Sequence, residues 1–153
     1  MSSLRERFTA DLKDAMKAGD KGKVSTLRLI TSALKDKDIE ARGLGKGETS
    51  ADELLALLQK MIKQRQESIA IYDANGRPEL AAGERAEVEV ISAYLPKQMS
   101  DAEVKAAIDA AIAETGASAV KDMGKVIGVL RANYAGQMDF GKVSPMVKAA
   151  LGG

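Results

Sequence analysis

Twice in this sequence, a serine is followed three residues later by a glutamate and then by apolar residues spaced three and four apart. The two segments begin at Ser50, with Glu53, and at Ser100, with Glu103. In such a capping box, the serine side chain accepts a hydrogen bond from the glutamate backbone N–H, and the glutamate side chain bonds back to the serine. Each serine is therefore predicted to begin a helix.

The rest of the sequence also favours helices over strands. Alanine, leucine, lysine and glutamate are abundant, whereas only 3 of the 153 residues are prolines and 3% are aromatic. These abundant residues lose little rotamer freedom in a helix. No alternation of apolar and polar residues indicates a strand. We therefore predict an all-α protein.

The expected helices fall into two groups, separated at Pro96. The ring of Pro96 disfavours helical geometry at Leu95, so we place a domain boundary there. Residues 1–96 are predicted to form an N-terminal domain of about four helices, and residues 97–153 a small C-terminal three-helix bundle. The four N-terminal helices are expected from Ser2 or Ser3 to Gly19, from Val24 to Arg42, from Ser50 to Ala74, and from Pro78 to Leu95.

The last helix has two possible starting points. Pro145 favours a start with Ser144 as the cap and the proline at the first helical position, where its missing N–H does no harm. Asp139 is the alternative cap. The helices before it are expected over residues 100–116 and 119–136.

Composition excludes several kinds of site. The chain has no cysteine and no histidine, which removes thiol nucleophiles, Ser-His-Asp triads and the common zinc sites. The glycine-rich segment GLGKGETS does not match the spacing of a phosphate-binding P-loop, and it follows a helix instead of a strand. It is predicted to be a mobile helix connection. No catalytic residue, metal site or cofactor is predicted.

The chain is expected to be soluble and cytoplasmic, with no membrane partner. No run of about 18 apolar residues is present, and Met1 leads directly into the charged segment from Leu4 to Arg7 instead of a signal peptide.

The segment from Ala119 to Gly136 is the most unusual one. It is expected to be a helix with an apolar stripe, while Lys121, Lys125 and Arg131 lie largely off that stripe. Gly124 and Gly128 share one side, although each costs a helix about 1 kcal/mol relative to alanine. Close packing against another helix is the favoured explanation. The alternative is a smooth surface on which the backbone of a ligand rests.

Positive charge gathers in this part of the chain, although the net charge of the whole chain is only +1. From Gly116 onward, five lysines and arginines stand against two aspartates. We predict phosphate contacts from this group that are few, sensitive to salt and insensitive to base sequence. The candidate tRNA- or phosphate-binding residues are Lys121, Lys125, Arg131 and Lys142. Lys121 and Lys125 are expected in the first turn of the helix, beside free backbone N–H groups.

A second basic band lies in the segment KMIKQRQES. Its residues Lys60, Lys63 and Arg65 are candidates for binding a partner protein. The alternative is a solvated helix face with internal ion pairs.

Three segments carry a resemblance to a known family. YLPKQMS at Tyr94–Ser100, KDMGKVIGVL at Lys121–Leu130 and GQMDFGKVSPMVKAAL at Gly136–Leu151 resemble the GatB/YqeY family. The resemblance covers essentially the whole chain as a stand-alone YqeY-like protein. It implies an N-terminal helical domain and a C-terminal three-helix domain, the latter similar to the tail of the GatB subunit of glutamyl/aspartyl-tRNA amidotransferase.

In that amidotransferase, the tail is implied to engage tRNA, while activation and ammonia delivery occur in other parts that this chain lacks. We therefore expect a tRNA-associated accessory protein that recognises folded RNA by shape and backbone, with no catalytic site of its own. The alternatives are a component of tRNA-dependent amidotransferase activity, a carbon–nitrogen ligase with glutamine as donor, and a protein–protein adaptor held through the N-terminal helices.

Overall fold

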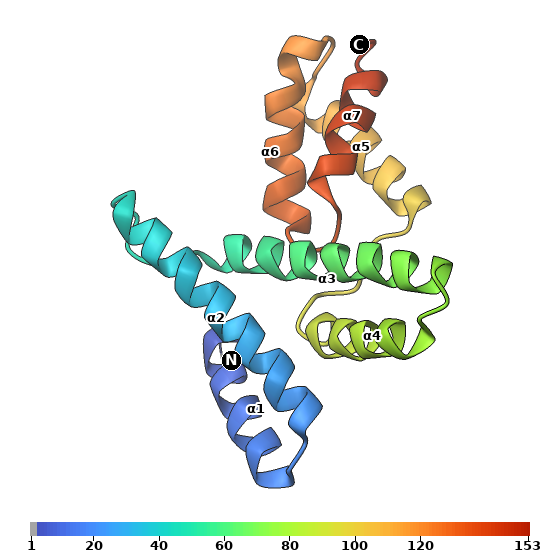
Figure 1. Ribbon diagram of the computed structural model, residues 1–153. Helices are drawn as coiled ribbons and strands as arrows, with labels where there is room; N and C mark the ends of the chain where they lie inside the picture. The colour runs from blue at the N-terminus through green and yellow to red at the C-terminus, as the bar shows by residue number, and fades with distance from the viewer. Residues whose placement is uncertain (1–2) are drawn as a thin grey trace. The chain divides into compact units, whose positions relative to one another are not determined.

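The computed structural model describes residues 3–153, and that part of the chain is helical and contains no strand (Figure 1). The predicted all-α fold, with four helices followed by three, is confirmed. The α-helices are α1 (Leu4–Ala18), α2 (Lys21–Gly43), α3 (Ala51–Ala74), α4 (Pro78–Ser92), α5 (Asp101–Thr115), α6 (Met123–Tyr134) and α7 (Phe140–Ala150), and a short 3-10 helix, η1 (Val120–Asp122), precedes α6.

Internal contacts divide the chain into two units, Met1–Leu95 and Pro96–Gly153. The division lies one residue before the boundary that we placed after Pro96. That the two units are separate domains stays a prediction.

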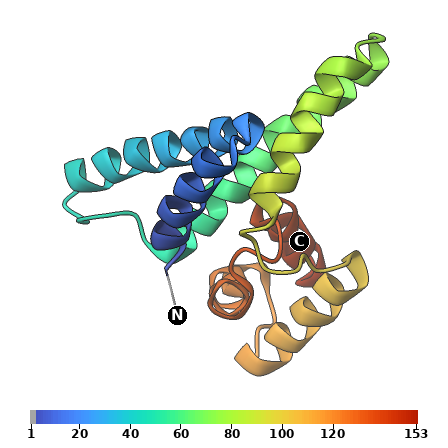
Figure 2. The same cartoon turned by 90° about the horizontal axis from the view of Figure 1, so that it is seen from below.

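Helices α1 and α2 form a tight antiparallel pair (Figures 1 and 2). Ser3 caps α1 by accepting from the N–H of Glu6, and Gly19 ends it with a left-handed φ of 71°. The other proposed cap, Ser2, lies outside the described residues. The predicted start of the second helix at Val24 is wrong, because the Asp20 side chain accepts from the N–H of Lys23 and α2 begins at Lys21.

Helices α3 and α4 make the most extensive helix pair of the first unit. Helix α3 has the predicted bounds and the predicted cap, Ser50, but the Glu53 side chain accepts from the Ser50 hydroxyl instead of completing the capping box. Helix α4 ends at Ser92, three residues before the predicted end, because Tyr94 and Leu95 form tight turns in front of Pro96. The buried core of this unit consists of Phe8, Ala15, Leu27, Ile30, Leu34, Leu54, Leu57, Leu58, Met61, Ile91 and Tyr94.

Tyr94, at the end of the first unit, packs against α1 and is hydrogen-bonded to it. Its ring meets the ring of Phe8 edge-on, with the centroids 4.8 Å apart, and the guanidinium of Arg7 lies 4.9 Å from the ring centroid. The hydroxyl donates to the Asp11 carboxylate. Burial and this hydrogen bond raise the pKa of Tyr94 far above its ordinary value. The segment before Pro96 is therefore packed into the first unit and is not a free linker.

In the second unit, α5 begins with the complete capping box predicted at Ser100 and ends at Gly116. The backbone N–H of Met99 and the side chain of Gln98 donate to carbonyls of the connection between α6 and α7, those of Gln137 and Gly136. The core between the three helices is formed by Val104, Ala107, Ile108, Ala111, Val126, Leu130, Met138, Val143, Val147 and Leu151.

The start of α7 differs from the favoured prediction. The helix begins at Phe140, with Asp139 as its cap, and Pro145 lies inside it. The Asp139 side chain accepts from the N–H of Gly141, and this cap starts the helix well before the proline. The favoured start at Ser144 is therefore wrong, and the alternative start at Asp139 is observed.

Candidate nucleic-acid interface on helix α6

Helix α6 has a buried face and an exposed face of very different composition. Val126 and Leu130 are fully buried in the core of the second unit. On the opposite side, Gly128 lies at the centre of an exposed face. At 100° per residue, Lys125 and Arg131 lie about 60° to either side of Gly128, and both are exposed. We call the four residues Gly124, Lys125, Gly128 and Arg131 the α6 face.

The two glycines of the α6 face are not explained by packing. A Cβ atom added at Gly124 or Gly128 would have none of the described atoms beyond its own helix within 4 Å. Neither glycine has the left-handed φ that would require the absence of a side chain. The favoured prediction of close helix packing is therefore wrong. The alternative, a smooth surface for the backbone of a ligand, stays open.

Lys121 is not where it was predicted to be. It lies in η1, before the first turn of α6. The carboxylate of Asp122 accepts from the N–H of Ser118, and this bond, together with the charges of Lys125 and Lys121, lowers the pKa of Asp122. The aspartate is therefore ionised next to both lysines, which reduces the attraction of this end of the helix for a phosphate.

Arg131 and Lys142 come from different helices. The guanidinium of Arg131 lies 5.0 Å from the centroid of the Phe140 ring, a cation–π contact that holds the arginine at the edge of the α6 face. Lys142 is exposed in the first turn of α7. It lies about 200° around that helix from Phe140, so it is not on the side that Arg131 covers. The compact part of the predicted group is thus Lys125 with Arg131.

The predicted partner-binding residues of α3 have different surroundings. The Nε atom of Arg65 lies 2.7 Å from Glu87 Oε2 of α4, and its Nη1 donates to the carbonyl of Met61. Only 14% of this arginine side chain is exposed. It joins α3 to α4, whereas Lys60 and Lys63 are exposed.

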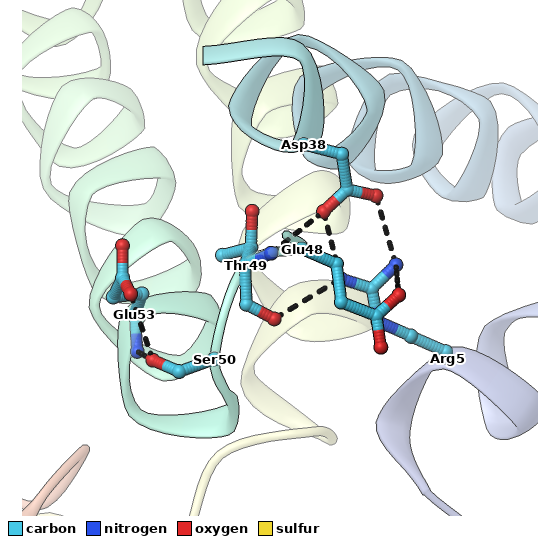
Figure 3. Close-up of polar contacts among 6 residues, drawn as sticks. All are labelled: Arg5, Asp38, Glu48, Thr49, Ser50 and Glu53. Carbon is cyan, nitrogen blue, oxygen red and sulfur yellow. Dashed lines mark hydrogen bonds and ion pairs between the residues drawn. The ribbon is translucent and has the colours of Figure 1, made fainter. Parts of the chain in front are cut away.

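A polar junction that sequence reasoning missed joins α1, α2 and the loop before α3 (Figure 3). Both Nη atoms of Arg5 donate to the two carboxylate oxygens of Asp38, at 2.9 and 2.8 Å. Asp38 also accepts from the N–H of Thr49 at 2.9 Å, and Arg5 donates to the Thr49 carbonyl at 3.1 Å. The end of the glycine-rich loop is therefore anchored at Thr49. No sequence motif marks this junction, because Arg5 and Asp38 are 33 residues apart.

Residues 3–153 contain neither a cluster of metal ligands nor a helix suited to cross a membrane. In this range, no three or more acidic side chains are grouped so as to hold a metal ion. No helix in the same range combines the length and the apolar character that a membrane span needs.

Comparison with known proteins decides the family. The sequence pattern of the Yqey-like proteins matches residues 5–151, which is nearly the whole chain. The chain belongs to the Yqey-like protein family. The resemblance found in the sequence is thereby confirmed at the level of this family.

Three yeast proteins illustrate the relationship of this Yqey-like chain to curated proteins. Each is named "Altered inheritance of mitochondria protein 41, mitochondrial". The proteins of Vanderwaltozyma polyspora and Saccharomyces cerevisiae are each 40% identical over 87 residues, 56% of this chain and 44% of the relative. The protein of Lachancea thermotolerans is 35% identical over 106 residues, 68% of this chain and 55% of the relative. The Yqey-like chain thus spans about half the length of these relatives.

The names of these relatives contradict the predicted cytoplasmic location, because each is called a mitochondrial protein. The prediction rested on the missing apolar run and the charged N-terminal segment. Neither of these features distinguishes the cytosol from a mitochondrial compartment.

Proposed function

We propose that this Yqey-like protein is an RNA-binding accessory protein whose second unit binds the sugar–phosphate backbone of folded RNA, tRNA above all, through the α6 face. The observation that carries the proposal is the open position of Gly124 and Gly128 between Lys125 and Arg131. The resemblance of the C-terminal segments to the tail of GatB, which is implied to engage tRNA, supports tRNA as the RNA.

The glycines suit such a role because they leave the surface of α6 without side chains at these positions, although they do not stabilise the helix. Each one costs the helix about 1 kcal/mol relative to alanine, and neither a neighbouring atom nor a left-handed φ requires it. A backbone can therefore approach α6 closely along these two positions. Lys125 and Arg131, on the two sides of the glycines, are placed to contact phosphates of that backbone.

We expect the α6 face to recognise the shape of an RNA and not its bases. It offers two cations and a flat surface, and the ring of Phe140 at its edge is already covered by Arg131. Stacked bases are thus not expected on this face. Because only a few phosphates are contacted, binding should be weak and should fall steeply with salt.

We expect Lys125→Ala to weaken the binding of tRNA by about threefold to tenfold at low salt. The lost phosphate contact should also reduce the slope of log K against log salt by about 0.9. Fluorescence anisotropy of labelled tRNA with the full chain, over a series of salt concentrations, measures both quantities.

The matched control is Lys105→Ala, because Lys105 is an exposed lysine of the same unit that lies on α5. This variant should bind tRNA like the wild type. Equal losses in the two variants, or wild-type binding of tRNA no tighter than that of a random duplex RNA, would contradict the proposal.

A further inference from the structure

A groove lies between the end of α1 and the first half of α2, in the first unit. Its volume is about 630 Å³, and its apolar lining includes Met16, Val24 and Leu29. Two of these side chains are unusually exposed, Met16 at 55% and Leu29 at 43%. The helices run side by side in both views (Figures 1 and 2). A groove that gathers exposed apolar side chains gives a partner apolar surface to bury.

The polar part of the groove is positively charged. Lys21, Arg28 and Ser25 line it, and none of its lining residues is acidic. Within residues 3–153, neither Lys21 nor Arg28 forms an ion pair. The nearest carboxylate at the start of α2, that of Asp20, is engaged with the backbone N–H of Lys23. The two cations are therefore available to a carboxylate from outside.

The spacing along α2 sets the size of an occupant. The lining residues of this helix run from Lys21 to Ser32, which is three helical turns or about 16 Å. Lys21 and Arg28 are two turns apart, about 10 Å, with Val24 between them. An occupant that meets both cations and the apolar floor together needs about three turns of helix.

A helical occupant fits better than an extended one. The backbone groups of α1 and α2 are bonded within their own helices, so the groove presents no strand edge to which an extended peptide could add. A helix satisfies its own backbone and needs only side-chain contacts. The flexible Met16 side chain can adapt its shape to the apolar face of such a helix.

We infer that this groove binds an acidic amphipathic helix of a partner protein. The helix places apolar side chains, spaced three and four residues apart, against Met16, Val24 and Leu29. It places two carboxylates, about seven residues apart, against Lys21 and Arg28. This inference does not depend on the RNA-binding proposal, because it concerns a different unit and a different kind of partner.

The test uses the full chain and a synthetic helical peptide of about three to four turns, with three leucines at helical spacing and two glutamates seven residues apart. One comparison peptide carries lysines in place of the glutamates. The other contains the same residues as the acidic peptide in an order that destroys the apolar stripe. Fluorescence anisotropy gives the affinities, and amide chemical shifts locate the site. The acidic peptide should bind at least tenfold more tightly than either comparison peptide and should shift residues around Met16 and Leu29.

Four variants on α2 separate the groove from the rest of the helix. Leu29→Ser and Arg28→Glu should each weaken the binding of the acidic peptide about tenfold. Ile39→Ser and Lys35→Glu are the matched controls, because they change an exposed apolar residue and an exposed cation outside the groove. Both controls should bind the peptide like the wild type. Circular dichroism confirms that each variant is folded.

Several outcomes would overturn the inference. One is acidic-peptide binding no tighter than that of the lysine peptide, and another is equal weakening in Leu29→Ser and Ile39→Ser. If vesicles of phosphatidylglycerol bind through Leu29 and Arg28 while the peptide does not, the occupant is a lipid surface. If sedimentation shows self-association that Leu29→Ser abolishes, the occupant is a second copy of the chain.

Discussion

Replacing Leu130 with alanine is expected to lower the free energy of unfolding of the second unit by about 3 kcal/mol. Leu130 is 0% exposed and lies on α6 within the core formed with α5 and α7. Removing a buried leucine leaves a cavity in addition to the lost burial. A unit of about 60 residues has a small free energy of unfolding. The loss should therefore remove much of the native population of this unit.

Hydrogen exchange of the amides in residues 96–153 measures this effect. The control is Met146→Ala, because Met146 is an apolar residue of the same unit with 38% exposure. It should change the free energy of unfolding by no more than about 0.5 kcal/mol. A cost below about 1 kcal/mol for Leu130→Ala would show that the core is not packed as described.

Asp38→Asn should destabilise the first unit by about 2 kcal/mol at neutral pH. The substitution removes the charge from a carboxylate that accepts from Arg5 and from the N–H of Thr49, and only 16% of this side chain is exposed. Hydrogen bonds to charged groups contribute more to the free energy of unfolding than hydrogen bonds between neutral groups. Arg5 and the N–H of Thr49 would lose their charged acceptor. Chemical denaturation followed by circular dichroism gives the difference. Asp36→Asn, an exposed aspartate of the same helix, should have almost no effect.

The same junction predicts a dependence on pH. The guanidinium of Arg5 and the N–H of Thr49 hold the pKa of Asp38 well below its ordinary value. Since the folded-state pKa lies below the unfolded one, the stabilisation is complete above about pH 5 and is lost as the pH falls through and below about 4. The difference between wild type and Asp38→Asn should shrink over that range. A difference that is constant from pH 7 to pH 2 would contradict this account.

The helix starts at Ser50 and Ser100 were predicted correctly because their signals are local. Ser50 and Ser100 cap helices where the sequence places them, since the serine and glutamate of each box are only three residues apart. The start of α7 shows the limit of such reasoning. Pro145 carries a strong preference for a first helical position, but the side chain of Asp139 caps the helix earlier in the chain and the proline is accommodated inside it.

Features that depend on contacts between distant residues were not predicted. The junction of Arg5, Asp38 and Thr49 brings together three separate segments. The groove between α1 and α2 arises from how two helices meet. The burial of Arg65 against Glu87 is likewise a product of packing between α3 and α4. Periodicity shows which face of a helix is polar, but it does not show which neighbour that face meets.

The open glycines of α6 are the central claim, and a glutamine at Gly128 tests it most directly. If the glycines serve only the fold, a better helix former there improves stability and leaves RNA binding intact. We expect Gly128→Gln to raise the free energy of unfolding by about 0.5 kcal/mol or more, because the position has room for a side chain. We also expect it to weaken tRNA binding about tenfold, because the side chain would stand where the RNA backbone approaches.

Gly83→Gln is the matched control, since Gly83 lies inside α4 of the first unit and has equally open surroundings. It should stabilise the chain in the same way and leave tRNA binding unchanged. The decisive measurement is therefore the affinity of the full chain for tRNA in the Gly128→Gln variant. We expect a more stable protein that binds tRNA about tenfold more weakly, and a more stable protein with wild-type affinity would contradict a role of the glycines in RNA binding.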